Sequence, residues 1–74
     1  MQNYEVMYHK IIAGNVRVMR KKAKFSQEKL AELLGCSREF ISRVENNKEK
    51  LSLRMVLKLS FIFKMPPENF FKKE

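Results

Sequence analysis

The chain of 74 residues lacks the residues from which several kinds of functional site are built. Its single cysteine, Cys36, excludes an internal disulfide and any zinc site made of several cysteines. His9 is its only histidine, so a solvated or packed side chain is the simpler interpretation, and no metal site is expected. With one histidine, one cysteine and no glycine-rich phosphate loop, neither an enzyme nor a cofactor-binding protein is expected.

Glycine, proline and long hydrophobic runs are equally scarce. Two glycines and two prolines in a chain with 45% hydrophobic residues favour a compact helical domain over a disordered tail. No apolar run approaches the ~20 residues that cross a bilayer, and residues 1–10 lack the apolar segment of a signal peptide. We therefore expect one domain, a cytoplasmic location and no membrane partner.

Positive charge, in contrast, is abundant. Sixteen Lys and Arg residues against eight Asp and Glu residues give a net charge of +8. Residues 1–24 carry six basic residues and one Glu, whereas residues 25–50 carry five residues of each sign. A basic excess attracts a polyanion by steering and by counterion release from phosphates, although it also serves solubility alone. Because the two signs alternate in the middle third, a basic amphipathic membrane binder is disfavoured.

The segment from Gln27 to Asn46 organises the rest of the chain. Its pattern predicts a helix over residues 27–34, followed by a sharp turn in which Gly35 takes a positive φ. Ser37 then acts as the N-cap of a second helix. The residues predicted to face inward are Leu30, Ala31, Leu34, Phe40, Ile41 and Val44. The opposite face is predicted to point outward and carries a row of hydrogen-bonding side chains, as a helix that contacts base edges needs. This outward row consists of Ser37, Arg38, Glu39, Ser42 and Arg43.

This segment resembles the helix-turn-helix of the Xre-like family, the phage-repressor type of small bacterial or phage transcriptional regulators that includes restriction-modification controller-like proteins. The resemblance covers residues 11–71 and rests on several positions at fixed offsets, which are Arg20, residues 25–31, Gly35, Ser37, residues 41–46, Ser52 and Leu53. It implies an all-α fold, a compact five-helix lambda-repressor-like DNA-binding domain with a helix-turn-helix at helices 2 and 3. Residues 11–74 would form this domain, and residues 1–10 would be an N-terminal extension or the start of helix 1.

The flanking segments have helical patterns of their own. Residues 10–22 are expected to form the first helix, with an inner face of Ile12, Val16, Met19 and Ala23. Residues 1–10 either extend this helix, with Asn3 as its N-cap, or form a mobile arm. A fourth helix, capped by Ser52, is expected over residues 53–64. Its core-facing residues are expected to be Leu53, Val56, Leu57, Ser60 and Phe63, with Leu59 and Ile62 at the flank of this face. A short fifth helix runs from Pro67 through Phe71.

The resemblance implies base contacts at the first, second and sixth residues of the recognition helix, expected over residues 38–46. There Arg38 and Arg43 suit guanine O6 and N7, and Glu39 suits cytosine N4. Phe40 or the methylene of Ser37 would contact a thymine methyl group. The alternative for Glu39 and Arg43 is a surface ion pair at i and i+4. Phosphate contacts are expected from Ser26, Gln27, Ser42, Asn46, Lys48, Lys50 and Arg17.

Two further expectations concern how the helices and subunits assemble. The resemblance pairs Arg20 with Glu45 as a structural ion pair that holds the first helix to the recognition helix. Phe61, on an otherwise polar face, and Phe70 and Phe71, which close the core or a subunit interface, are the dimer-interface candidates.

These features together predict a sequence-specific regulator that binds a double-stranded DNA operator. We expect a homodimer on a pseudo-palindromic site, because one recognition helix reads too few base pairs to find one site in a genome. No small-molecule ligand is expected. The alternatives are a protein-interaction module that retains the fold, or an antitoxin of a toxin–antitoxin pair.

Overall fold

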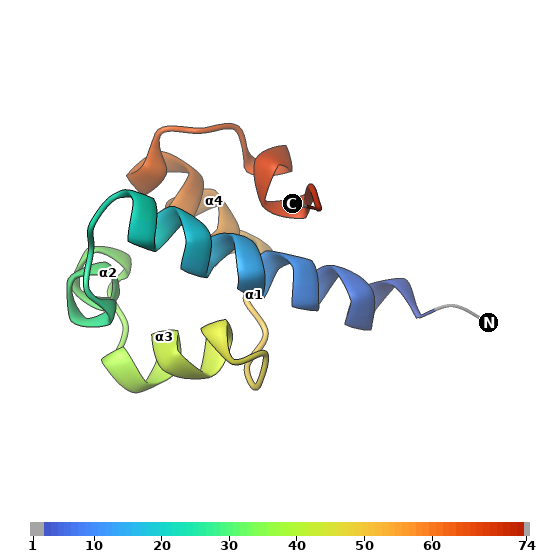
Figure 1. Ribbon diagram of the computed structural model, residues 1–74, viewed down its shortest axis with the longest axis horizontal. Coiled ribbons are helices and arrows are strands. Elements are labelled where there is room, and N and C mark those ends of the chain that lie inside the picture. Colours follow the sequence, from blue (N-terminus) through green and yellow to red (C-terminus); the bar gives the residue numbers. More distant parts are fainter. Residues whose placement is uncertain (1–2, 74) are drawn as a thin grey trace.

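A computed structural model describes residues 3–73 of the chain. Within this range there are four α-helices, α1 (Tyr4–Lys22), α2 (Gln27–Leu34), α3 (Arg38–Glu45) and α4 (Leu53–Phe63), and one 3-10 helix, η1 (Pro67–Phe71). The expectation of five α-helices was therefore wrong. The last segment has only five residues, and helical pieces of this length commonly take the 3-10 form. Helix α1 runs through the middle, with α3 on one side and α4 and η1 on the other (Figure 1).

Each α-helix starts at the cap that the sequence predicts. The side chains of Asn3, Ser26, Ser37 and Ser52 each accept a hydrogen bond from the backbone N–H three residues on, at 2.9 to 3.2 Å. Gly35 ends α2 with φ of 80°, and its N–H and that of Cys36 both donate to the Ala31 carbonyl. The predicted bounds of α2 are confirmed, while α3 ends one residue earlier than expected.

The core lies where all five elements meet. Phe70 of η1 is fully buried at its centre, and its ring lies 6.4 Å from that of Phe63. Of the two alternatives for Phe70, closing the core is confirmed, and its place as a dimer-interface candidate was wrong, because a fully buried side chain is not available to a partner subunit. The other fully buried large side chains come from α1, α2, α3 and α4 and are Val16, Leu30, Leu34, Ile41, Val44 and Leu59.

Helix α4 is rotated relative to the expected orientation. Val56, Leu59 and Ser60 are buried, whereas Leu53 and Leu57 are exposed. Eight of its eleven residues are apolar, so several helical faces satisfied the i, i+3, i+4 pattern and the periodicity alone did not select the inner one. The expected exposure of Phe61 is confirmed, because 86% of this residue is accessible to solvent.

Helix α1 is longer than its expected core. It begins at Tyr4, so residues 4–10 are its first turns, and this end projects beyond the other helices (Figure 1). Ile12 and Val16 are buried as expected, but Ala23 is exposed, because the helix ends at Lys22. None of the helices in residues 3–73 is long and apolar enough to span a membrane.

A buried amide ties the C-terminal segment to α1. The Nδ2 atom of Asn15 donates to the backbone carbonyls of Phe70 at 2.7 Å and of Lys72 at 2.8 Å, and lies 3.4 Å from that of Asn69. The side chain of Asn15 thereby satisfies carbonyl groups that a 3-10 helix leaves free. This contact fixes η1, and with it Phe70, against the middle of α1.

Candidate nucleic-acid interface

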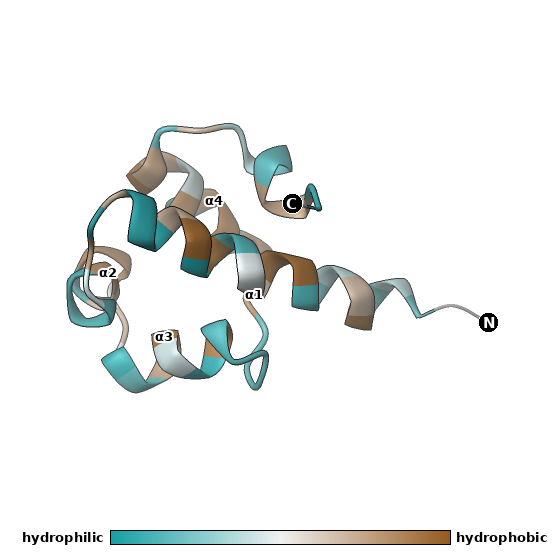
Figure 2. Ribbon diagram, in the orientation of Figure 1, coloured by the Kyte–Doolittle hydropathy of each residue, from teal (hydrophilic) through white to brown (hydrophobic). Residues whose placement is uncertain are grey.

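Helix α3 has two faces with separate roles. Ile41, Val44 and Glu45 are buried against the rest of the domain. Arg38, Glu39 and Arg43 are exposed on the opposite face, together with the cap Ser37, while Phe40 and Ser42 are half-buried. Phe40 also packs against the core, so only part of its ring can meet a ligand. Figure 2 shows the hydrophilic residues at both ends of α3 and in the loop that follows it.

The exposed charges of α3 form ion pairs other than the expected one. Arg38 Nη2 lies 3.7 Å from Glu39 Oε2, and Arg43 Nε donates to Glu49 Oε1 at 3.3 Å. The alternative pairing of Glu39 with Arg43 was therefore wrong. Asn47 adopts a left-handed conformation with φ of 58°, which turns the chain after α3 and brings Glu49 back beside Arg43. Such exposed pairs are worth at most about 1 kcal/mol, so a phosphate or base can replace either partner.

A buried polar network holds α3 in place. Arg20 donates from Nε to Glu45 Oε2 at 2.6 Å and from Nη2 to Oε1 at 3.0 Å, which is a bidentate pair. Its Nη1 donates to the Phe25 carbonyl at 2.8 Å, and Gln27 Nε2 donates to Glu45 Oε1 at 3.1 Å. The structure thus brings the expected partners Arg20 and Glu45 together and adds Gln27. One carboxylate joins α1, α2 and α3.

The candidate phosphate-contacting residues fall into three groups. Ser26 and Gln27 lie at the amino end of α2, where free N–H groups suit an anion. Ser42 and Asn46, whose side chains are 3.5 Å apart, lie at the end of α3. The exposed residues of the third group lie in the loop after α3 and on α1, and are Lys48, Lys50 and Arg17.

Several contacts of this region have no signal in the sequence pattern. Lys50 Nζ donates to Glu5 Oε2 at 3.3 Å, which links the loop after α3 to the first turns of α1. Lys58 Nζ donates to the Leu34 carbonyl at 2.9 Å, at the carboxyl end of α2. Both pairs are far apart in sequence, and only the tertiary fold brings them together.

The turn between α2 and α3 holds the single cysteine. Cys36 is half-buried, and burial raises the pKa of its thiol above the ordinary value, while the positive charge of Lys58 acts in the opposite direction. The thiol therefore stays protonated near neutral pH. Among residues 3–73, no three His, Cys, Asp or Glu side chains lie close enough to hold a metal ion.

Comparisons with known proteins give a consistent result. A family model described as helix-turn-helix, HTH_3, matches residues 16–70, which is well over half of the chain. The crystal structure of the restriction-modification controller protein C.AhdI from Aeromonas hydrophila is similar, with 30% identity, a TM-score of 0.78, and coverage of 85% of this chain and 96% of that chain. A search of curated protein sequences finds no match.

Two further solved structures are similar. The hypothetical transcription factor NHTF from Neisseria has 25% identity and a TM-score of 0.81, over 88% of this chain and 75% of that one. An HTH_3 family transcriptional regulator from Vibrio cholerae has 23% identity and a TM-score of 0.79, over 89% of this chain and 37% of that one, which shows the fold alone. With the family match over residues 16–70 and the outward row of α3, the chain belongs to the Xre-like helix-turn-helix family of DNA-binding transcription regulators.

Proposed function

We propose that this regulator binds a specific double-stranded DNA operator as a homodimer, with α3 in the major groove. The observation that carries the proposal is that Ser37, Arg38, Glu39 and Arg43 of the outward row are exposed, while Glu45 on the opposite face is fixed by Arg20 and Gln27. A helix held in this way presents its hydrogen-bonding groups in a defined orientation, which direct readout of base edges requires.

Each outward residue has a role that suits its chemistry. Arg38 and Arg43 contact guanine O6 and N7, once they leave the weak ion pairs with Glu39 and Glu49. Glu39 accepts from cytosine N4. Ser37 Oγ accepts from the Phe40 N–H at 3.0 Å, so its methylene, or the exposed part of the Phe40 ring, is what remains for a thymine methyl group. The operator half-site therefore contains guanine and cytosine.

Contacts to the DNA backbone set the register of α3. The amino end of α2, with Ser26 and Gln27, binds one phosphate of the DNA backbone. The positively charged side chains of Lys48 and Lys50 bind other phosphates. Ser42, Asn46 and Arg17 complete this set. Such contacts carry no sequence information, so their loss weakens binding to all sequences alike.

The exposed apolar side chains of α4 support the homodimer. Leu53, Leu57 and Phe61 are exposed at i, i+4 and i+8, so they form one stripe that is symmetric about Leu57. An antiparallel pair of α4 helices related by a two-fold axis at Leu57 would pack Leu53 of one copy against Phe61 of the other. Leu33 of α2 lies beside the stripe and lines the same groove. We call these four residues the α4 stripe.

The test combines selection of bound duplexes from a random pool at ~150 mM salt with two variants. We expect a two-fold symmetric motif whose half-sites lie about 34 to 36 Å apart. Arg38→Ala should abolish discrimination at one base pair, at a loss of about 1 to 3 kcal/mol, whereas Lys48→Ala should weaken binding to all sequences and reduce the salt slope by about one. Uniform loss of affinity in both variants would contradict the assignment of α3. The absence of any enriched motif would contradict the proposed function.

A further inference from the structure

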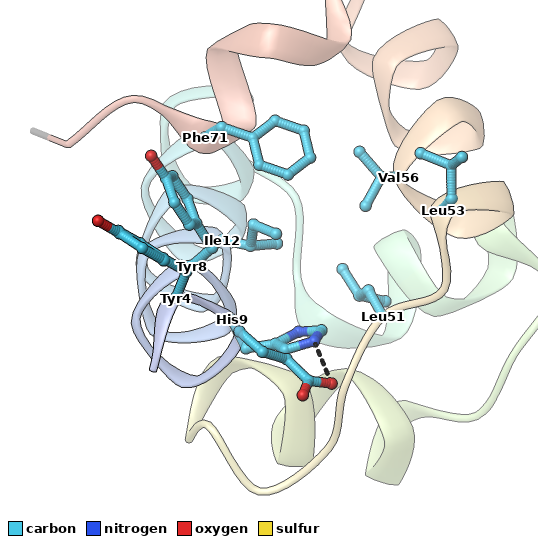
Figure 3. A pocket seen from close by; sticks show the side chains of 9 residues that line it. Tyr4, Tyr8, His9, Ile12, Leu51, Leu53, Val56 and Phe71 are labelled. Carbon is cyan, nitrogen blue, oxygen red and sulfur yellow. Dashed lines mark ion pairs between the residues drawn. The ribbon is translucent and has the colours of Figure 1, made fainter. Parts of the chain in front are cut away.

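The first turns of α1 border a cleft that DNA binding does not use. A cleft of about 610 Å³ lies between the amino end of α1, the start of α4 and η1. Figure 3 shows Tyr4 and Tyr8 of α1 and Phe71 of η1 along one side, with Leu53 of α4 on the other side. Ile12 lies between the two sides and is buried. The walls of the cleft are therefore mainly apolar.

The aromatic side of the cleft is ordered but uncovered. The rings of Tyr8 and Phe71 meet edge to face with their centroids 6.2 Å apart. Tyr4 lies one helical turn before Tyr8, and 61% of it is accessible to solvent. Both tyrosines belong to the first turns of α1, the end that projects beyond the other helices (Figure 1), and Tyr8 is covered in part by Phe71 whereas Tyr4 is mostly exposed. Apolar side chains of the cleft thus remain accessible to solvent in the folded domain.

This cleft continues into the α4 stripe. Leu53 lines both the cleft and the groove beside Leu57 and Phe61. Of the eight large hydrophobic residues that are exposed in residues 3–73, seven lie on the combined surface, and the eighth is Val6. One continuous apolar surface therefore runs from Phe61 through Leu53 to Tyr4. A surface of this extent on a small domain marks an interface.

The area available indicates what covers this surface. From their exposed fractions, the four residues of the α4 stripe offer roughly 500 Å², if a fully exposed large side chain counts about 200 Å². An obligate homodimer interface buries at least about 1,000 Å² from each partner, of which about 65% is apolar, so it needs roughly 650 Å² of apolar surface and the stripe alone is too small. Tyr4, Tyr8 and Phe71 bring the total to roughly 800 Å² on the same scale. The stripe and the cleft together thus supply what one dimer interface needs.

Resting on the proposed homodimer, we infer that the first two turns of α1 form a dimerisation arm whose tyrosines pack against a second copy of the chain. The net charge of +8 opposes self-association, and the combined surface is lined by Glu5, His9, Arg54 and Lys58 beside its apolar residues, with Lys58 Nζ donating to the Leu34 carbonyl. There Glu5 lies 3.3 Å from Lys50 and 4.0 Å from His9, so its carboxylate has partners within the same copy.

The same arm contacts the loop that is proposed to bind phosphates. Val6 and His9 line a groove with Lys48 and Lys50, and His9 also lines the cleft that holds the tyrosines. The arm therefore lies between the dimer surface and the DNA-contacting loop. Loss of the tyrosines should weaken the dimer first and operator binding as a consequence of it.

Sedimentation equilibrium of the full chain, without DNA and up to ~100 µM, tests the inference. The variant is Tyr4→Ser with Tyr8→Ser, and the matched control is Val6→Ser, a residue of the same arm that is 55% exposed outside the cleft. We expect the dimer Kd to rise by at least about tenfold in the double variant, as for interface residues that carry binding energy, and to stay unchanged in the control. The circular dichroism spectra of all three chains should agree, because none of the replaced side chains belongs to the buried core.

The outcomes separate this inference from the proposed function. If the wild-type chain dimerises and the double variant dimerises equally well, the arm is excluded while the homodimer stands. An equal weakening by Val6→Ser and by the tyrosine variant would also overturn the inference, since the effect would then belong to the helix and not to its aromatic face. A wild-type chain that remains monomeric overturns both the arm and the homodimer, and leaves the cleft to a different protein.

Discussion

The buried pair of Arg20 and Glu45 gives the sharpest prediction about the fold. Only 3% of the Glu45 side chain and 11% of the Arg20 side chain are exposed, and the two share a bidentate contact. Replacing either residue by Ala leaves the other charge buried without its partner, which costs about 3 to 5 kcal/mol. A domain of this size has a stability of about 4 to 11 kcal/mol, at ~0.05 to 0.15 kcal/mol per residue. Each single variant should therefore be close to unfolding.

Urea unfolding followed by circular dichroism measures the effect. We expect each single variant to lose at least about 3 kcal/mol, which lowers the melting temperature by more than about 12 °C. The double variant Arg20→Met with Glu45→Leu removes both charges and should be more stable than either single variant. As a control, Lys29→Ala breaks the exposed pair with Glu32, 3.2 Å apart, and should cost less than about 0.5 kcal/mol. If the double variant lost as much unfolding free energy as the two single variants together, the reasoning would be refuted. Such a result would show that a buried charge without its partner does not cause the loss in the single variants.

Three other variants test separate features of the fold. Asn15→Ala leaves the carbonyls of Phe70 and Lys72 without their donor and should cost about 2 to 3 kcal/mol in urea unfolding, whereas a loss below about 1 kcal/mol would contradict the anchor. Gly14→Ala adds a Cβ that meets no atom within 4 Å, so it should stabilise α1 by about 1 kcal/mol and leave operator affinity unchanged, and any drop in melting temperature would contradict this. Because burial raises the pKa of Cys36, the folded state keeps a proton that the unfolded state loses. Stability should fall as the pH rises through the folded pKa, and Cys36→Ser should not show this fall in urea titrations.

Local chemistry accounts for what the sequence predicted well. The caps Ser26, Ser37 and Ser52, the turn at Gly35 and the bounds of α2 all depend on residues within a few positions of one another. The predicted outward row of α3 rests on the same logic, since a strongly amphipathic helix has one clear inner face. The roles of these residues toward DNA stay predictions.

Tertiary contacts account for what the sequence did not predict. The rotation of α4 depends on which of several apolar faces meets Phe70, and its periodicity is ambiguous. The pairing of Arg43 with Glu49 depends on a loop conformation, and the contacts of Asn15 join positions more than 50 residues apart. The length of α1 was undecided, because the pattern of residues 4–10 fitted both a helix and an arm.

The separation of the two faces of α3 has a consequence for how new binding specificities can arise. The residues that keep this helix in position, Glu45 with Ile41 and Val44, are different from the outward residues Arg38, Glu39 and Arg43. The outward positions can therefore be exchanged without disturbing the packing of the domain. With the proposed roles of these residues in base reading, single mutations would change the preferred operator step by step while every variant stays folded. The scaffold stays constant while the target changes.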